Sequence, residues 1–205
     1  MAVSGALLLL FLLVHLIGNL QVFGAPEAIN SYAHLLHSMP ALVIGARIMM
    51  LLLFAVHIIT SIQLTLENRA ARPVSYHKED TVAATLASRT MIWTGLLVGA
   101  FLVIHLLHLT GHQIGPELQM VNGEPDLHSN IVASFKNPLF AGFYMVCMIA
   151  IYFHLVHAFQ SAFQTFGLSH KKCMPVIKTI GIIYAAIIGA GNFLIPLSIL
   201  LGFVK

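Results

Sequence analysis

Five runs of apolar residues, each long enough to cross a bilayer as a helix, dominate this chain of 205 residues. They cover about 4–23, 41–66, 90–112, 139–166 and 176–203. Because hydrocarbon offers the backbone no hydrogen-bond partners, a run of this kind must cross it as a helix. Only 8% of the residues are charged and 59% are apolar, which excludes an ordinary soluble domain. We therefore expect an all-α integral membrane protein in which residues 1–205 form a single membrane domain.

The distribution of basic residues predicts how these helices cross the membrane. Seven of the ten Lys and Arg residues flank the second and fourth connections: Arg69, Arg72, Lys78, Arg89, Lys171, Lys172 and Lys178. Lys136 and Lys205 lie on the opposite face, and Arg47 lies inside a span. Since cytoplasmic loops carry the Lys and Arg excess, we expect a cytoplasmic N-terminus and an outer C-terminus. The net charge of +3 then reflects topology and gives no support to nucleic-acid binding.

Other local features bear on processing and redox state. The first run has neither a basic segment before it nor a small-residue cleavage site, which predicts a retained helix and not a signal peptide. Cys147 lies within the fourth span and Cys173 in a cytoplasmic loop, so we expect two free thiols. Apart from three occurrences of the spacing HxxH, we expect no internal repeat.

Four histidines lie inside the first four apolar runs, one in each, at two matched depths. His15 lies 8 residues in from the outer end of its run, and His105 lies 7 residues in from the same side. His57 and His154 lie 16 and 15 residues in. At about 1.5 Å per residue, these positions form two layers roughly 12 Å apart. We name His15 and His105 the outer pair, and His57 and His154 the inner pair.

Two layers of paired histidines predict two haem b groups, each with two axial imidazole ligands. An ionisable side chain in lipid is costly, so four of them favour a buried cofactor over ordinary packing. A haem in an electron-transfer site takes one axial ligand from each side of its ring. The first four helices would then form a haem-binding four-helix bundle. In the alternative, each histidine singly forms a hydrogen bond to a neighbouring helix. His157 fits the inner depth as well as His154, and His108 is expected at the interface or bonded near the outer pair.

Several other residues are candidates for binding the same groups. Arg47 lies level with the outer pair and would bind a haem propionate or extend to the outer surface. Arg89, at the cytoplasmic end of its helix, would mark topology or bind an inner propionate. Tyr32 and His34, in the first outer connection, would line a quinone pocket. The charged segment 67–88 is the expected docking site for a partner subunit.

Other classes of membrane protein fit these residues less well. The cytochrome b of quinol:cytochrome c complexes carries two ligands 13 or 14 residues apart on one helix, a spacing absent within any helix here. Di-iron hydroxylases need several histidine boxes, of which only His108 and His112 match one. Transporters ordinarily place acids or broken helices at the midplane. A haem-free, histidine-rich metal or structural protein remains an alternative.

Four motifs, in order, resemble the cytochrome b subunit of succinate:quinone oxidoreductases. They are Phe-Leu-Leu-Val-His15-Leu-Ile-Gly-Asn, Glu27-Ala-Ile-Asn-Ser-Tyr-Ala-His34, Arg89-Thr-Met-Ile-Trp-Thr-Gly ahead of His105, and Gly142-Phe-Tyr ahead of Phe153-His154. The resemblance covers almost the whole chain and is to the class with one membrane chain, five helices and two haems, which includes fumarate reductases. It departs from that class in lacking the basic segment that usually precedes the first helix.

The resemblance implies a function and a set of partners. One haem ligand would come from each of the first four helices, with His154 and not His157 as the fourth. A flavoprotein subunit and an iron-sulfur subunit would dock on the cytoplasmic face, and electrons would pass between them and a quinone, expected to be menaquinone. The chain would be the quinone-reactive anchor in the cytoplasmic membrane of a prokaryote, in contact with lipid and with no succinate chemistry of its own. A higher oligomer of the complex is compatible with this. An anchor of another membrane oxidoreductase is the alternative.

Overall fold

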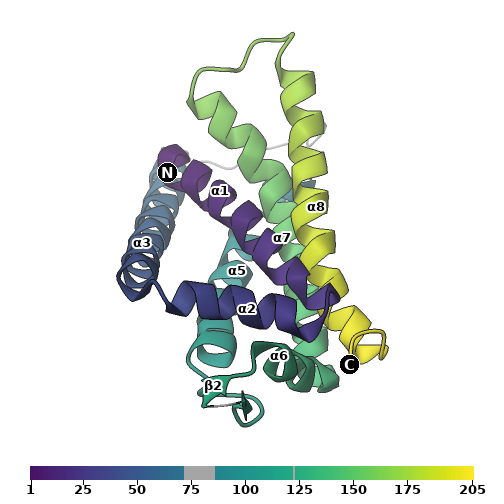
Figure 1. Ribbon diagram of the computed structural model, residues 1–205. Helices are drawn as coiled ribbons and strands as arrows, with labels where there is room; N and C mark the ends of the chain where they lie inside the picture. Colours follow the sequence, from purple (N-terminus) through teal and green to yellow (C-terminus); the bar gives the residue numbers. More distant parts are fainter. Residues whose placement is uncertain (72–85, 122) are drawn as a thin grey trace.

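The computed structural model describes residues 1–71, 86–121 and 123–205 and is built mainly from helices (Figure 1). Within that part of the chain, five helices are long and apolar enough to cross a membrane. They are α1 (Ala2–Asn19, continued by the 3-10 turn η1, Leu20–Phe23), α3 (Pro40–Ala70), α5 (Met91–His105, continued by the π-helical turn η2, Leu106–Thr110), α7 (Pro138–Thr165) and α8 (Met174–Leu200). The single turn α4 (Leu86–Arg89) precedes α5. The prediction of a multi-pass, all-α membrane protein is confirmed, and every span ends within four residues of its expected position.

Proline and a side-chain cap determine where several helices begin. Pro26, Pro40 and Pro138 are the first residues of α2 (Pro26–His37), α3 and α7. Proline suits this position because its fixed φ matches the helix and its missing N–H would have no partner there. The N–H of Leu139 also donates to the Asn137 side chain at 2.9 Å, which caps α7. Local sequence therefore sets the start of these helices.

The central span is α7, which packs along α8 and also contacts α1 and α5 (Figure 1). Leu16 of α1, Cys147 of α7 and Ile188 of α8 are among the residues of one buried cluster. Glycine allows this close approach, since a Cβ added to Gly191 of α8 would lie 2.7 Å from Leu16 Cδ1. Apolar surface gains nothing by leaving lipid, so packing of this kind is what holds helices together in a membrane. Cys147 and Cys173 are free thiols, as predicted.

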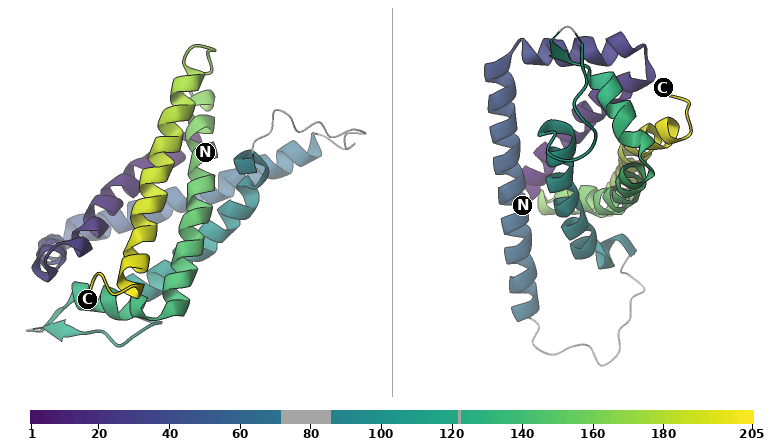
Figure 2. Two further views of the ribbon diagram at one scale, coloured as in Figure 1. Left: turned by 90° about the vertical axis from the view of Figure 1, so that its right-hand side faces the viewer. Right: turned by 90° about the horizontal axis from the view of Figure 1, so that it is seen from below.

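The second span, α3, packs mainly against α1 and stands at the margin of the molecule (Figure 2). None of its 31 residues is buried. Its half-buried residues recur along one face: Val43, Met50, Leu53, Phe54, His57, Thr60, Ser61 and Thr65. The protein's own side chains therefore leave most of the surface of α3 without close-packed neighbours.

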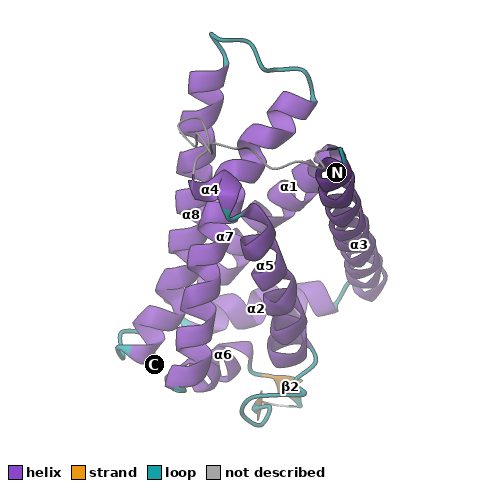
Figure 3. Ribbon diagram, turned by 180° about the vertical axis from the view of Figure 1, so that it is seen from behind, coloured by secondary structure: helices purple, strands orange, loops and turns teal. Residues whose placement is uncertain are grey.

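A cap of short elements closes the end of the spans at which α1 and α5 finish (Figure 3). It consists of α2, α6 (Leu127–Lys136) and an antiparallel pair, β1 (Met120–Val121) with β2 (Glu124–Pro125). The helix α6 lies within the connection between the third and fourth spans. Asp126 begins this helix by accepting hydrogen bonds from the Ser129 N–H at 3.1 Å and the Ser129 Oγ at 2.6 Å. A side-chain cap of this kind is a standard helix start.

Asp126 also joins α6 to α2, and this link is expected to weaken in acid. Its carboxylate accepts from Asn30 Nδ2 at 2.9 Å, and the Asn30 side chain in turn accepts from the His128 N–H at 3.0 Å. Hydrogen bonds from Ser129, followed by that from Asn30, lower the pKa of Asp126 below its usual 3.8. A lowered carboxyl pKa contributes stability above 3.8 that is lost as the pH falls through the folded-state value.

Hydrogen exchange of residues 127–136 against pH, corrected for intrinsic rates, would measure this effect. In the wild-type protein the protection of α6 should fall as the pH drops below 3.8, whereas the Asp126→Asn variant should show little pH dependence. Amides of α7 serve as the internal reference. An equal loss of protection in both proteins would assign the acid sensitivity to another group.

Candidate histidine sites

The outer pair comes together in the structure. His15 of α1 and His105 at the end of α5 have ring centroids 5.8 Å apart, with perpendicular planes. Each ring stacks on a phenylalanine one turn earlier in its own helix. Phe11 lies 5.3 Å from His15, and Phe101 lies 5.5 Å from His105. The two aromatic side chains fix the rings in a dry, apolar setting between the helices.

The spacing of the outer pair suits two axial ligands of one metal ion. With a metal–imidazole bond of about 2 Å, imidazoles on opposite sides of a metal have ring centroids about 6 Å apart. Perpendicular planes are allowed because each ring can rotate about its bond to the metal. Haem iron in electron-transfer proteins takes two such ligands. The centroid distance of the outer pair is therefore close to the one that two imidazoles on a single haem iron would have.

Tyr144 of α7 connects His105 to a further histidine. Its hydroxyl lies 3.5 Å from His105 Nδ1 and 3.0 Å from His108 Nδ1. His108 is only 2% exposed, and it stacks on Phe140 with a centroid distance of 4.1 Å. Two positions were expected for His108, and the structure shows the one that is hydrogen-bonded near the outer pair. The π-helical turn η2 carries His108, and such turns are frequent at functional sites.

Each histidine of the inner pair meets a hydroxyl group and a glycine of a neighbouring helix. The Ser4 Oγ of α1 lies 3.5 Å from His57 Nδ1, and the Thr94 Oγ1 of α5 lies 3.3 Å from His154 Nδ1. A Cβ added to Gly5 or Gly95 would lie 3.4 Å from Cε1 of the same ring. The described residues show no ring contact between His57 and His154 like the one within the outer pair. In the structure, Nδ1 of each inner ring therefore contacts a hydroxyl oxygen of a neighbouring helix.

These contacts reveal a short repeat that the sequence analysis missed. Gly5, Phe11 and His15 of α1 recur 90 positions later in α5 as Gly95, Phe101 and His105, and Ser4 corresponds to Thr94. The following spans show a weaker match, because His57 and His154 each have a glycine 12 residues before and a glutamine 6 residues after. The expectation of a chain without repeats was wrong at this scale. The signal was the common spacing between a hydroxyl–glycine pair and a histidine. It is easy to overlook because it depends on few identical residues.

The proposed propionate partners, Arg47 and Arg89, form no side-chain hydrogen bond or ion pair in the described residues. Both side chains are exposed. Arg72, Lys78 and most of the expected docking segment 67–88 lie outside the described residues.

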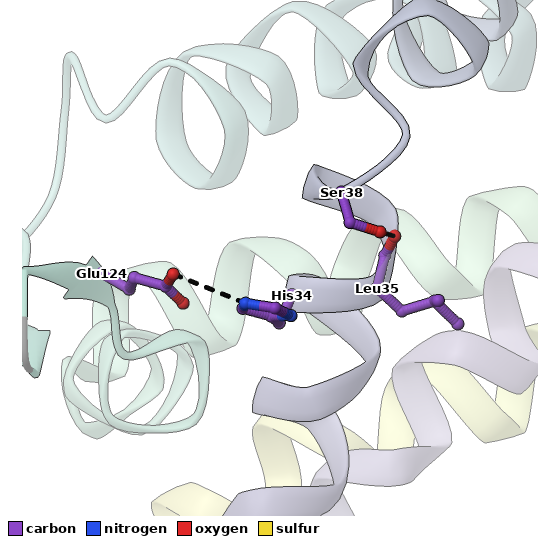
Figure 4. Close-up of polar contacts among 4 residues, drawn as sticks. All are labelled: His34, Leu35, Ser38 and Glu124. Atoms are coloured by element: carbon purple, nitrogen blue, oxygen red, sulfur yellow. Dashed lines mark hydrogen bonds and ion pairs between the residues drawn. The ribbon is translucent and has the colours of Figure 1, made fainter.

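The structure does not bring the two expected quinone-pocket residues together. The Tyr32 ring lies against α1, so close that a Cβ added to Gly18 would be 3.0 Å from its Cε1. His34 points away from the spans and pairs with Glu124 of the cap at 3.5 Å (Figure 4). Residues two apart on a helix face different directions, which explains the separation.

Comparison with protein-family models, curated proteins and solved structures finds no match to this chain. Within the described residues, no three His, Cys, Asp or Glu side chains converge as a metal site.

Proposed function

We propose that this chain is a di-haem cytochrome b that anchors a succinate:quinone oxidoreductase in the membrane. The observation that carries the haem assignment is the outer pair, with ring centroids 5.8 Å apart between two spans. The assignment to succinate:quinone oxidoreductases rests on the four motifs that resemble that family. The two parts of the proposal can therefore be tested separately.

The four histidines would have equivalent roles at two depths. His15 and His105 would ligate an outer haem b, and His57 and His154 an inner one. When bound, haem b supplies reversible one-electron chemistry at its iron. The apolar residues around the histidines would exclude water from the iron, and the surrounding side chains would tune its potential. Their arrangement in two layers would allow electrons to cross most of the membrane within one chain.

The packing of α3 supports a large non-protein group beside the inner pair. Close packing of side chains holds membrane helices together, yet none of the 31 residues of α3 is buried. His57 lies on the half-buried face of this helix. A haem between α3 and α7 would supply the packing that the protein's own side chains do not.

The partners follow from the family resemblance. A flavoprotein subunit and an iron-sulfur subunit would dock at the end of the spans where the inner pair lies, which the basic residues assign to the cytoplasm. A membrane quinone, with menaquinone as the first choice, would exchange electrons with the chain. The setting would be the cytoplasmic membrane of a prokaryote.

The test is haem quantification on the full chain purified from membranes, followed by reduction assays. We expect two haem b per chain by the pyridine haemochrome method and low-spin spectra in both redox states. Succinate should then reduce them in the complex with its co-purifying subunits. Absence of haem would overturn the assignment and leave a histidine-rich structural or metal-binding protein. Two haems that succinate and quinol both fail to reduce would indicate an anchor of another oxidoreductase.

A further inference from the structure

We propose that Ser4 and Thr94 are positioning residues that hold His57 and His154 in the tautomer with hydrogen on Nδ1, leaving Nε2 free to bind iron. This inference rests on the proposed haem function and extends it to residues that bind no haem themselves. It concerns the orientation and tautomer of the ligand histidines before haem binds.

The tautomer follows from where the hydroxyl protons go. Ser4 Oγ donates its only proton to the Met1 carbonyl at 2.8 Å. Thr94 Oγ1 directs its proton to the carbonyls of Met91 at 3.0 Å and Thr90 at 3.1 Å. With its proton engaged, a hydroxyl can only accept from another group. The contacts to the inner pair must then run from Nδ1–H of each histidine to the hydroxyl oxygen.

The proton on Nδ1 also decides which ring nitrogen is left for a metal. In a neutral imidazole, hydrogen on Nδ1 leaves the lone pair on Nε2, the nitrogen available to a metal.

The same arrangement occurs at corresponding positions of α1 and α5. On α1 the sequence is Met1-Ala-Val-Ser4-Gly5, and on α5 it is Met91-Ile-Trp-Thr94-Gly95. In both, the glycine lets the helix backbone approach the Cε1 edge of the ring, and the hydroxyl residue before it reaches Nδ1. Ser4 is itself only 5% exposed. The same contacts at both positions argue for a role in orienting the inner ligands.

Such a bond affects the metal as well as the ring. A histidine that donates its second N–H becomes a more basic ligand, and loss of this partner typically costs about 10-fold to 100-fold in affinity for the metal. A more basic ligand stabilises the oxidised iron. Removal of the hydroxyl should therefore raise the midpoint potential of the inner haem and weaken its retention, with the outer haem unchanged.

The experiment compares hydroxyl-free and hydroxyl-retaining variants of the full chain in membranes. Ser4→Ala and Thr94→Val remove the acceptor, and Ser4→Thr and Thr94→Ser keep it. Ser198→Ala and Thr179→Val are matched controls, because these hydroxyls also donate to a carbonyl of their own helix, at 2.9 and 3.0 Å, and form no hydrogen bond to a histidine of the described residues. The readouts are haem content, optical redox titration and the low-spin electron paramagnetic resonance signal. The inner component is identified as the one lost in His154→Leu.

We expect Thr94→Val and Ser4→Ala each to shift the inner component to higher potential and to lower its occupancy about 10-fold or more under limiting haem. Thr94→Ser and Ser4→Thr should behave as the wild type, which distinguishes the hydroxyl from a general packing effect. If the hydroxyl-free variants match the controls while the wild type binds two haems, the positioning role is wrong and the proposed function stands. If the wild type binds no haem, both the proposed function and this inference are wrong.

Discussion

Leucine in place of His154 is expected to leave the purified chain with one haem b instead of two. The imidazole is one of two proposed axial ligands of the inner haem, and leucine offers no donor atom to the iron. A single remaining ligand, His57, would lie on α3, none of whose residues is buried. Haem quantification should therefore show the loss of about half of the pigment, with the outer component retaining its potential.

His157→Leu is the matched control for this prediction. His157 lies one turn further along α7 and is half-buried like His154, but it has no contact resembling that of Thr94 with His154. It should keep both haems. For the outer pair, His105→Leu should lose the other haem, whereas His108→Leu should keep both. Loss of haem in His157→Leu but not in His154→Leu would reverse the ligand assignment, and two haems in single replacements of all four histidines would contradict it.

A valine at Gly191 is expected to destabilise the protein and to release the outer haem before the inner one. A Cβ at this position of α8 would meet Leu16 Cδ1 at 2.7 Å and Cδ2 at 3.1 Å. Leu16 is 2% exposed and has little room to move. Overpacking of a close-packed site typically costs about 1–3 kcal/mol. Because Leu16 follows His15 in α1, displacement of this helix should disturb the outer pair most directly.

Thermal unfolding in detergent, followed together with haem absorbance, would measure both effects. Gly45→Val is the control, because a Cβ at Gly45 on α3 meets nothing within 4 Å. Leu16→Ala should partly rescue Gly191→Val by removing the atoms with which valine collides. A Gly191→Val variant as stable as Gly45→Val, or one that Leu16→Ala makes worse, would show that α1 and α8 do not pack as described.

The sequence predicts the spans well because, in lipid, an apolar run of sufficient length can satisfy its backbone hydrogen bonds only as a helix. The starts of α3 and α7 follow from Pro40 and Pro138. The depths of His15 and His105 follow from the regular rise of a helix, and the structure brings these two residues together.

Contacts that depend on helix rotation and on long-range packing could not be predicted in the same way. Counting residues gives the depth of His108 but not the direction in which the turn η2 points it, which is toward Tyr144. Tyr32 and His34 were grouped because they are near in sequence, yet on α2 they face different neighbours. Ser4 was overlooked because a serine in an apolar run gives no signal until its partner His57 is known.

The offset of 90 residues between α1 and α5 suggests that this chain carries two copies of an older helical hairpin. Both copies run in the same direction, so an axis along the membrane normal would relate them, as in other parallel membrane repeats. Equivalent histidines would face each other across that axis, and both proposed haems would lie on it. One hairpin pairing with a second copy of itself would thus already have provided both sites.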